Sequence, residues 1–246
     1  MARSQKSKRR IKGRRGRAAH AGWEVESIHF SDQALGPGVD TPSPADVLAA
    51  IQQLPPELDW PSIRAHVVPL FERVRPYPPE MPERAQAIVA PGVTIGFGID
   101  FGPGFVAVTP EMVERWSMSM ADLAAHAIAR LHELAGRVKA GQVHHAPIGD
   151  VDVSVLQTNL GIGSVLVLAP SELARLFGTG PRLFIAPMRD LLIALPADVD
   201  AEFAGWLYEE IAMRDPNCLY PRAFAFDGSA VTVTPLGAPL QHLLAG

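Results

Sequence analysis

The stretch Arg182-Leu-Phe-Ile-Ala-Pro-Met-Arg-Asp-Leu-Leu-Ile-Ala-Leu-Pro196 places one charged pair between two apolar runs. The runs, 183–186 and 191–195, have the length and the branched side chains typical of buried strands. Pro187 suits the second position of a type I turn formed by residues 186–189. We therefore expect a β-hairpin at the centre of a sheet, with Arg189 and Asp190 held inside it.

Helical and strand patterns on both sides of this hairpin predict an α+β fold. We expect a mixed or antiparallel sheet of hairpins with helices packed on one face, a helical N-terminal part and a disordered basic tail. The high content of Pro (23) and Gly (21) predicts many turns and linkers. The expected divisions are a basic tail (1–22), a linker (23–42), a helical segment ending in a proline-rich linker (43–82) and an α+β domain (83–246).

Helix-start residues and apolar spacing predict where the main helices lie. They predict helices from Ser43 to about Leu54, from Asp59 through Val74 with a kink at Pro69, from Thr109 through Trp116, from Ser119 to about Arg137, from Asp198 to about Met213, and a short one at 240–244. Runs rich in branched and aromatic residues predict strands. These runs are 86–89, 93–99, 105–108, 143–148, 151–156, 164–168, 222–226 and 230–234.

Residues 105–116 resemble residues 165–176 sixty positions later, with Pro110 matching Pro170 and Arg115 matching Arg175. The shared pattern predicts a strand followed by a helix that has proline at its first position. Two explanations remain open at this level. One is an internal duplication, and the other is the general use of the same chemistry at strand-to-helix turns.

The formal net charge of −4 hides a strong asymmetry. Residues 1–17 hold nine basic residues and no acidic one, which leaves 13 basic against 26 acidic residues in the rest of the chain. The acidic body argues against nucleic-acid binding by the folded part, because phosphates would be repelled. The tail is the candidate polyanion-binding segment, through Arg9, Arg10, Lys12, Arg14, Arg15 and Arg17. A solvated tail without a specific partner is the alternative.

The single cysteine, Cys218, rules out an intramolecular disulfide and fits the reducing cytoplasm. The basic start is not followed by the apolar run of a signal peptide, and no apolar stretch is long enough to span a membrane. We therefore expect a cytoplasmic protein. The sequence predicts no cofactor and no metal site.

Arg189 and Asp190 are the candidate binding residues, because a charge in an apolar hairpin needs a partner. Arg189 would offer a bidentate fork to a carboxylate or phosphate, oriented by Asp190. The alternative is a structural role for both. His144 and His145 with Asp150 and Asp152 form a weak metal candidate, because adjacent strand residues face opposite ways. Cys218 lacks a local catalytic partner, and no catalytic motif marks any nucleophile.

Residues 106–131 and 184–195 resemble the YtpQ-type bacterial proteins, a family of unknown function. Pro187, Arg189 and Asp190 match the family's apolar Pro-x-Arg-Asp hairpin, whereas Met188 departs from the expected asparagine. The resemblance covers about Ser62 to Phe226. It implies a cytosolic α+β domain and brings no catalytic residues.

Three functions follow as hypotheses. The first is a non-enzymatic protein-binding or adaptor domain, in which the sheet presents a surface or groove to an unknown protein partner and the tail adds electrostatic attachment. The second is an enzyme or binder for an anionic small molecule that uses Arg189 and Asp190. The third is a nucleic-acid or ribosome-associated protein that binds through residues 3–17.

Overall fold

The computed structural model describes residues 44–54, 57–73, 82–102, 104–212, 218–219, 221–234 and 236. The basic tail, the linker 23–42, most of the proline-rich linker and the predicted helix at 240–244 lie outside these residues. The elements are α1 (Pro44–Gln52), α2 (Trp60–Ile63), η1 (Arg64–His66), β1 (Val67–Leu70), β2 (Gln86–Ala90), β3 (Val93–Asp100), β4 (Phe105–Ala107), α3 (Pro110–Arg115), α4 (Met120–Ala135), η2 (Ala140–Gln142), β5 (Val143–Ile148), β6 (Val151–Gln157), η3 (Ser164–Leu168), α5 (Pro170–Phe177), β7 (Arg182–Met188), β8 (Leu191–Pro196), α6 (Ala201–Ala212), β9 (Ala223–Phe226) and β10 (Val231–Thr234).

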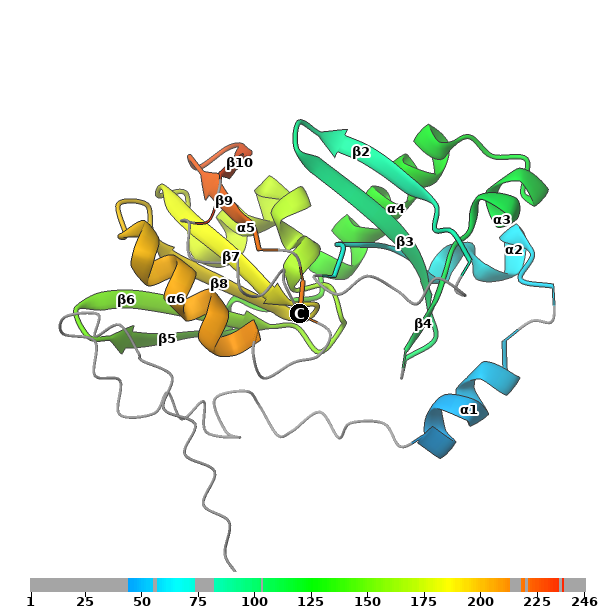
Figure 1. The fold of residues 1–246 in the computed structure, drawn as a ribbon, viewed down its shortest axis with the longest axis horizontal. Coiled ribbons are helices and arrows are strands. Elements are labelled where there is room, and N and C mark those ends of the chain that lie inside the picture. Colours follow the sequence, from blue (N-terminus) through cyan, green and yellow to red (C-terminus); the bar gives the residue numbers. More distant parts are fainter. Residues whose placement is uncertain are drawn as a thin grey trace, which may run out of the picture.

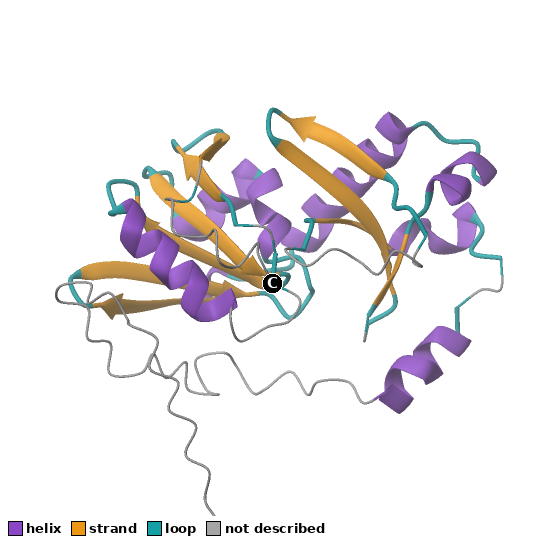
Figure 2. Ribbon diagram, viewed as in Figure 1, coloured by secondary structure: helices purple, strands orange, loops and turns teal. Residues whose placement is uncertain are grey.

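The predicted α+β class is confirmed (Figures 1 and 2). The described strands form two sheets, one with the order β1-β3-β2 and β4 also paired to β3, the other with the order β10-β9-β7-β8-β6-β5. Every strand pair in both sheets is antiparallel. The predicted hairpin forms β7 and β8, which lie at the centre of the six-stranded sheet.

Helices cover both faces of the six-stranded sheet, which corrects the expected arrangement on one face. Ile185 and Ile193 join the core under α6, whereas Phe184 and Leu192 join the core shared with η3 and α5. The physical reason is the continuous apolar composition of β7 and β8. Strands without polar alternation bury both of their faces, so each face needs a cover.

Helix α4 connects the cores of the two sheets. Its predicted buried face is confirmed, because Leu123, Ala127, Leu131 and Leu134 are all buried. The first two pack in the core of the four-stranded sheet, and the last two pack in the core shared with the six-stranded sheet. Ser119 caps α4 by accepting a hydrogen bond from the Asp122 N–H, as its position predicted.

Two short apolar segments differ from the prediction. The helix that opens at Trp60 ends after two turns, and Val67–Leu70 forms strand β1, which pairs with β3. Ser164–Leu168 forms the 3-10 helix η3 and is not a strand. A short apolar run that is buried on all sides can form a helix or a strand, because its apolar residues show neither the helical nor the strand spacing clearly.

The weak repeat is not a repeat of structure. Phe105–Ala107 is a strand, whereas the matching residues lie in η3. The shared part is the helix that begins at Pro110 in one copy and at Pro170 in the other. This finding favours common strand-to-helix turn chemistry over duplication.

Candidate functional site

Arg189 and Asp190 are the two turn residues between β7 and β8, since Met188 pairs with Leu191 across the turn. This corrects the expected turn at residues 186–189. Pro187 lies within β7 at a register shift, where its missing N–H does not interrupt the pairing with β8. Its carbonyl oxygen accepts a hydrogen bond of 2.9 Å from the Leu219 N–H.

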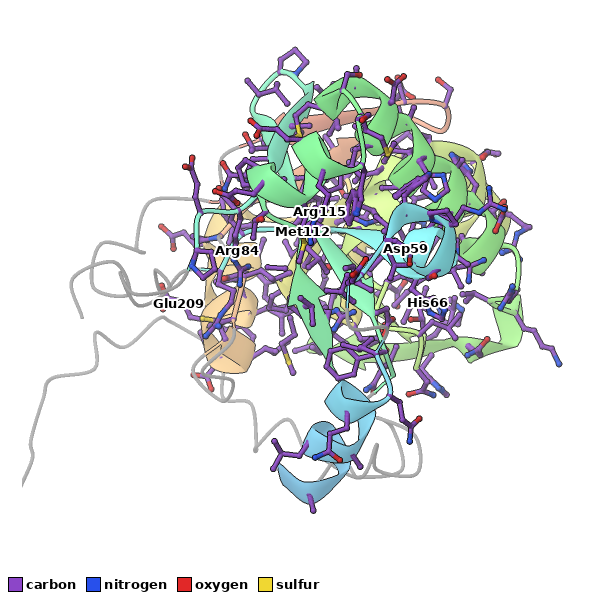
Figure 3. The ribbon with its side chains drawn as sticks, turned by 90° about the vertical axis from the view of Figure 1, so that its right-hand side faces the viewer. Asp59, His66, Arg84, Met112, Arg115 and Glu209 are labelled. Carbon is purple, nitrogen blue, oxygen red and sulfur yellow. The ribbon has the colours of Figure 1, made fainter. Side chains whose placement is uncertain are left out.

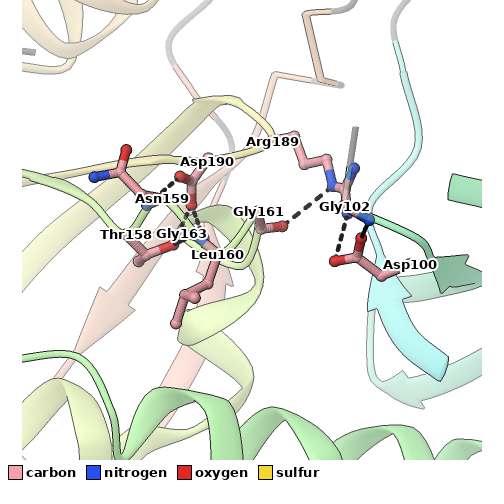
Figure 4. A network of polar contacts seen from close by, with 9 residues as sticks. All are labelled: Asp100, Gly102, Thr158, Asn159, Leu160, Gly161, Gly163, Arg189 and Asp190. Atoms are coloured by element: carbon pink, nitrogen blue, oxygen red, sulfur yellow. Dashed lines mark hydrogen bonds and ion pairs between the residues drawn. The ribbon is translucent and has the colours of Figure 1, made fainter. Parts of the chain in front are cut away.

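Asp190 organises the loop that follows β6 (Figure 4). One carboxylate oxygen accepts hydrogen bonds from the Thr158 hydroxyl and, at 3.0 Å, from the Gly163 N–H. The other accepts from the Asn159 N–H at 2.6 Å. Hydrogen bonds to a carboxylate are stronger than those between neutral groups. Both oxygens of Asp190 are therefore occupied in holding residues 158–163.

The loop after β6 requires glycine at positions 161 and 163, where it lies close to the hairpin turn. Gly163 would place a Cβ 2.7 Å from the carbonyl carbon of Asp190. Gly161 has a φ of +68° and lies beneath the Arg189 guanidinium, which would be 3.0 Å from a Cβ. A side chain at position 163 would press against the Asp190 backbone, and one at position 161 would strain the backbone at its positive φ.

Arg189 reaches from the six-stranded sheet to the four-stranded sheet. Its Nε–H donates to the Gly161 carbonyl at 3.2 Å, and one terminal nitrogen lies 3.7 Å from an Asp100 carboxylate oxygen at the end of β3. The guanidinium carbon lies 4.4 Å from the centre of the Phe105 ring, within the range of a cation–π contact. Asp100 also accepts from the Gly102 N–H at 2.8 Å. Arg189 thus links the two sheets.

A cleft of about 760 Å³ lies between the two sheets, and both Arg189 and Asp190 line it. The other lining residues come from α1, the α2–η1 segment, the end of β3, α4 and the loop after β6. Figure 3 labels His66, a lining residue at the end of η1, and Asp59, the residue that precedes α2. Two lining side chains have a buried polar atom without a hydrogen-bond partner, Arg130 at Nε and Gln157 at Oε1.

The remaining predicted candidates lie elsewhere. His144 and His145 are on β5, an edge strand that does not line the cleft, and the His145 ring bonds the Ser154 hydroxyl at 2.9 Å. Among the described residues, no group of three His, Cys, Asp or Glu side chains has the geometry of a metal site. Cys218 is buried. The tail residues Arg9, Arg10, Lys12, Arg14, Arg15 and Arg17 lie outside the described residues.

Cys218 lies near Tyr208, a buried tyrosine of α6. Burial, and to a smaller extent the nearby Cys218, raises the pKa of the Tyr208 phenol above its ordinary value. The phenol donates a hydrogen bond to the Leu219 carbonyl. This contact fixes the chain before β9 against α6 and leaves Tyr208 with a structural role.

Sequence reasoning did not identify the loop residues 158–163, Arg130 or Gln157. The signal that could have identified the loop is Gly161-Ile162-Gly163, because glycine often marks a close approach of the backbone to another segment. Arg130 lies on α4 between positions of the apolar face, and nothing in its local sequence distinguishes it from a solvated arginine.

Comparisons with protein-family models, with curated proteins and with solved structures returned no match. The resemblance to YtpQ-type proteins therefore stays a prediction. In the part of the chain that the structure describes, none of the helices has the length and apolar character needed to cross a membrane.

Proposed function

We propose that this chain is a non-enzymatic protein-binding domain that accepts an extended peptide along the edge of β2. The observation that carries this proposal is an apolar groove of about 420 Å³ that Val89 and Ala90 of β2 help to line. The groove lies between the β2–β3 hairpin of one sheet and the β10 edge of the other. Its lining residues are Val89, Ala90, Pro91, Val93, Ile128, Val167, Leu168, Pro170, Phe224, Val231, Thr232 and Val233.

Strands β2 and β10 are the terminal strands of their sheets. The outer edge of a terminal strand presents backbone N–H and C=O groups that a further strand can pair with. Peptides that bind in this way gain affinity from backbone hydrogen bonds and specificity from pockets for alternate side chains. The groove beside β2 supplies such a pocket, and it is apolar apart from Thr232.

Ile88 marks β2 as the contact strand. It is 80% exposed, whereas its neighbours Ala87 and Val89 pack toward the core of the four-stranded sheet. An exposed isoleucine on an edge strand favours pairing with another chain. Lysine and proline are the residues that normally block such edges, and β2 contains neither of them. The partner we propose is therefore an extended segment with apolar side chains at alternate positions.

The occupied state of Asp190 supports a binding function over the enzymatic hypothesis. A general base needs an accessible oxygen, and both oxygens of Asp190 already accept hydrogen bonds from the loop. The proposal places the protein in the cytoplasm, with the basic residues 3–17 adding electrostatic attraction to the partner complex.

A selection of random displayed peptides against the purified protein, followed by calorimetric titration of the enriched peptides, tests this function. We expect peptides with alternating apolar residues that bind the Ile88→Lys variant at least about tenfold more weakly. Leu48→Lys is the matched control, because Leu48 is also exposed (60%) but lies on α1. Peptide binding should slow hydrogen exchange of the β2 amides.

Two results would contradict the proposal. One is equal binding of the enriched peptides to the wild-type protein and the Ile88→Lys variant. The other is protection from hydrogen exchange at a segment other than β2 and β10, since pairing at an edge protects the amides of that edge.

A further inference from the structure

We propose that the partner at the edge of β2 is β2 of a second copy of this chain, an inference that rests on the function proposed above because both use the free edge of this strand. The two β2 strands lie antiparallel about a two-fold axis at Ile88. The four-stranded sheets of the two copies then continue into one another across that axis.

The sequence of β2 has the properties that the proposed function requires of a partner. Four of its five residues are apolar, none is charged, and the branched side chains of Ile88 and Val89 favour an extended backbone. A second copy presents this segment as a strand that is already formed. It therefore pays less conformational entropy on binding than a free peptide, which must first become ordered.

A two-fold axis at Ile88 places compatible residues opposite each other. Ile88 faces the same residue of the second copy, Ala87 faces Val89, and Gln86 faces Ala90. Opposed residues of an antiparallel pair have Cβ atoms about 4.5–5.5 Å apart, so the two isoleucines are in contact. Their contact removes from water a side chain that is 80% exposed in the single chain, which is favourable.

The charges beside β2 permit this arrangement. Arg84 is four residues before Ile88, so its two copies are eight strand positions apart, or about 27 Å. Glu72 accepts a hydrogen bond from Gln86 Nε2 at 2.9 Å and lies 3.7 Å from Arg222. The two Gln86 residues, and the Glu72 side chains bound to them, are about 14 Å apart along the strands. Both separations exceed the screening length of about 8 Å at physiological ionic strength, so like charges do not oppose the contact.

The symmetry and the length of β2 determine the size and the strength of the assembly. A two-fold contact uses the same edge on both copies, so it stops at a dimer and does not continue into a filament. The strand is five residues long and has a register shift between Ile88 and Ala90, which limits the backbone hydrogen bonds across the axis. We therefore expect a weak dimer with a dissociation constant of about 1–100 µM.

Sedimentation equilibrium of the full chain over about 1–300 µM, a range that spans this dissociation constant, tests the dimer. We expect the mass to rise with concentration from 26.5 kDa toward twice that value. Ile88→Lys should weaken dimerisation at least about tenfold, because the two new charges face each other, whereas Ile88→Val should retain it. Leu48→Lys is the matched control on α1 and should dimerise like the wild type, since Leu48 is also exposed.

A disulfide test locates the contact. Ile88→Cys should form covalent dimers on mild oxidation, because opposed Cβ atoms on the axis lie close to the separation that a disulfide spans. Leu48→Cys should form fewer, and the native Cys218 is buried in both variants. Circular dichroism should show all the variants folded, and the covalent dimer reports on the contact independently of Ile88→Lys.

Salt separates this dimer from an electrostatic one. Residues 1–17 hold nine basic residues, whereas the rest of the chain has an excess of acidic ones, which favours contacts between the tail of one copy and the body of another. Such contacts weaken as salt is added, because charges on the surface are screened. The β2 dimer depends on apolar and backbone contacts and should persist in about 0.5 M NaCl.

Three results would overturn the inference. They are a mass of 26.5 kDa at every concentration, equal dimerisation of the wild type and Ile88→Lys, and loss of the dimer in about 0.5 M NaCl. A monomer that still binds the enriched peptides at β2 would refute the second copy as the partner and leave the proposed function standing. Dissociation of the dimer by those peptides would support the inference, because both compete for one edge.

Discussion

Replacing Asp190 by alanine should destabilise the protein without any ligand or substrate being present. The change removes the acceptor for the Thr158 hydroxyl and for the N–H groups of Asn159 and Gly163. Hydrogen bonds to a charged group contribute about 1.5–3 kcal/mol each, and a buried donor left without a partner costs about 1–3 kcal/mol. The three bonds share one carboxylate, so their contributions are not additive.

We therefore expect Asp190→Ala to lower the free energy of unfolding by about 3–5 kcal/mol, a large part of the total of about 5–15 kcal/mol of an ordinary domain. Asp190→Asn should lose about half as much, because its amide keeps one oxygen acceptor but faces a donor with its NH2 group. Urea titration followed by circular dichroism measures both losses through the midpoint and the slope.

Asp198→Ala is the control for the loss of a carboxylate. Asp198 is exposed in the loop between β8 and α6, and its substitution should change stability by no more than about 0.5 kcal/mol. A loss below about 1 kcal/mol in Asp190→Ala, with an unchanged slope, would refute the structural role and return Asp190 to the list of candidate functional residues.

Gly163→Ala tests the packing of the same loop, and Tyr208→Phe tests a separate buried group. Gly163→Ala should lower the free energy of unfolding by about 1–3 kcal/mol by overpacking against the Asp190 backbone, whereas Gly141→Ala, with open space around its Cβ, should cost little; urea midpoints compare them, and equal midpoints would disprove the close approach. Wild-type stability should fall as the pH rises above about 10, because the unfolded phenol of Tyr208 ionises there while its raised folded pKa keeps it neutral. Tyr208→Phe should be less stable at pH 8 by about 1 kcal/mol for the lost bond to Leu219, and this difference should shrink above pH 10; a constant difference would argue against the raised pKa.

Local chemistry was sufficient to predict the elements that depend on neighbouring residues. The side chain of Thr109 caps α3, as its place before Pro110 indicated. Asp227 and Gly228 begin the turn between β9 and β10, and the N–H groups of Ala230 and Ser229 lower the pKa of the Asp227 carboxyl by bonding to it. These contacts span at most three residues, so they can be recognised in the sequence.

The predictions that were wrong concern elements whose structure is decided by distant residues. Leu70 is buried against the six-stranded sheet although β1 belongs to the other sheet, and this environment favours a strand over the helix that was expected. The start of α6 is a smaller case, because Asp200 and not Asp198 accepts from the Glu202 N–H. The cleft depends on the packing of both sheets, and no local pattern encodes it.

The charged pair in the central hairpin shows how far adjacency in sequence can mislead. Arg189 and Asp190 were expected to act together, with Asp190 orienting Arg189 toward a ligand. Instead, Asp190 binds the loop after β6, and Arg189 crosses to Asp100 and Phe105 of the other sheet. Both contacts act on the same wall of the cleft, since Gly161, which accepts from Arg189, belongs to the loop that Asp190 holds. The pair therefore shapes the cleft. The buried polar atoms without a hydrogen-bond partner belong to two other lining residues, Arg130 and Gln157.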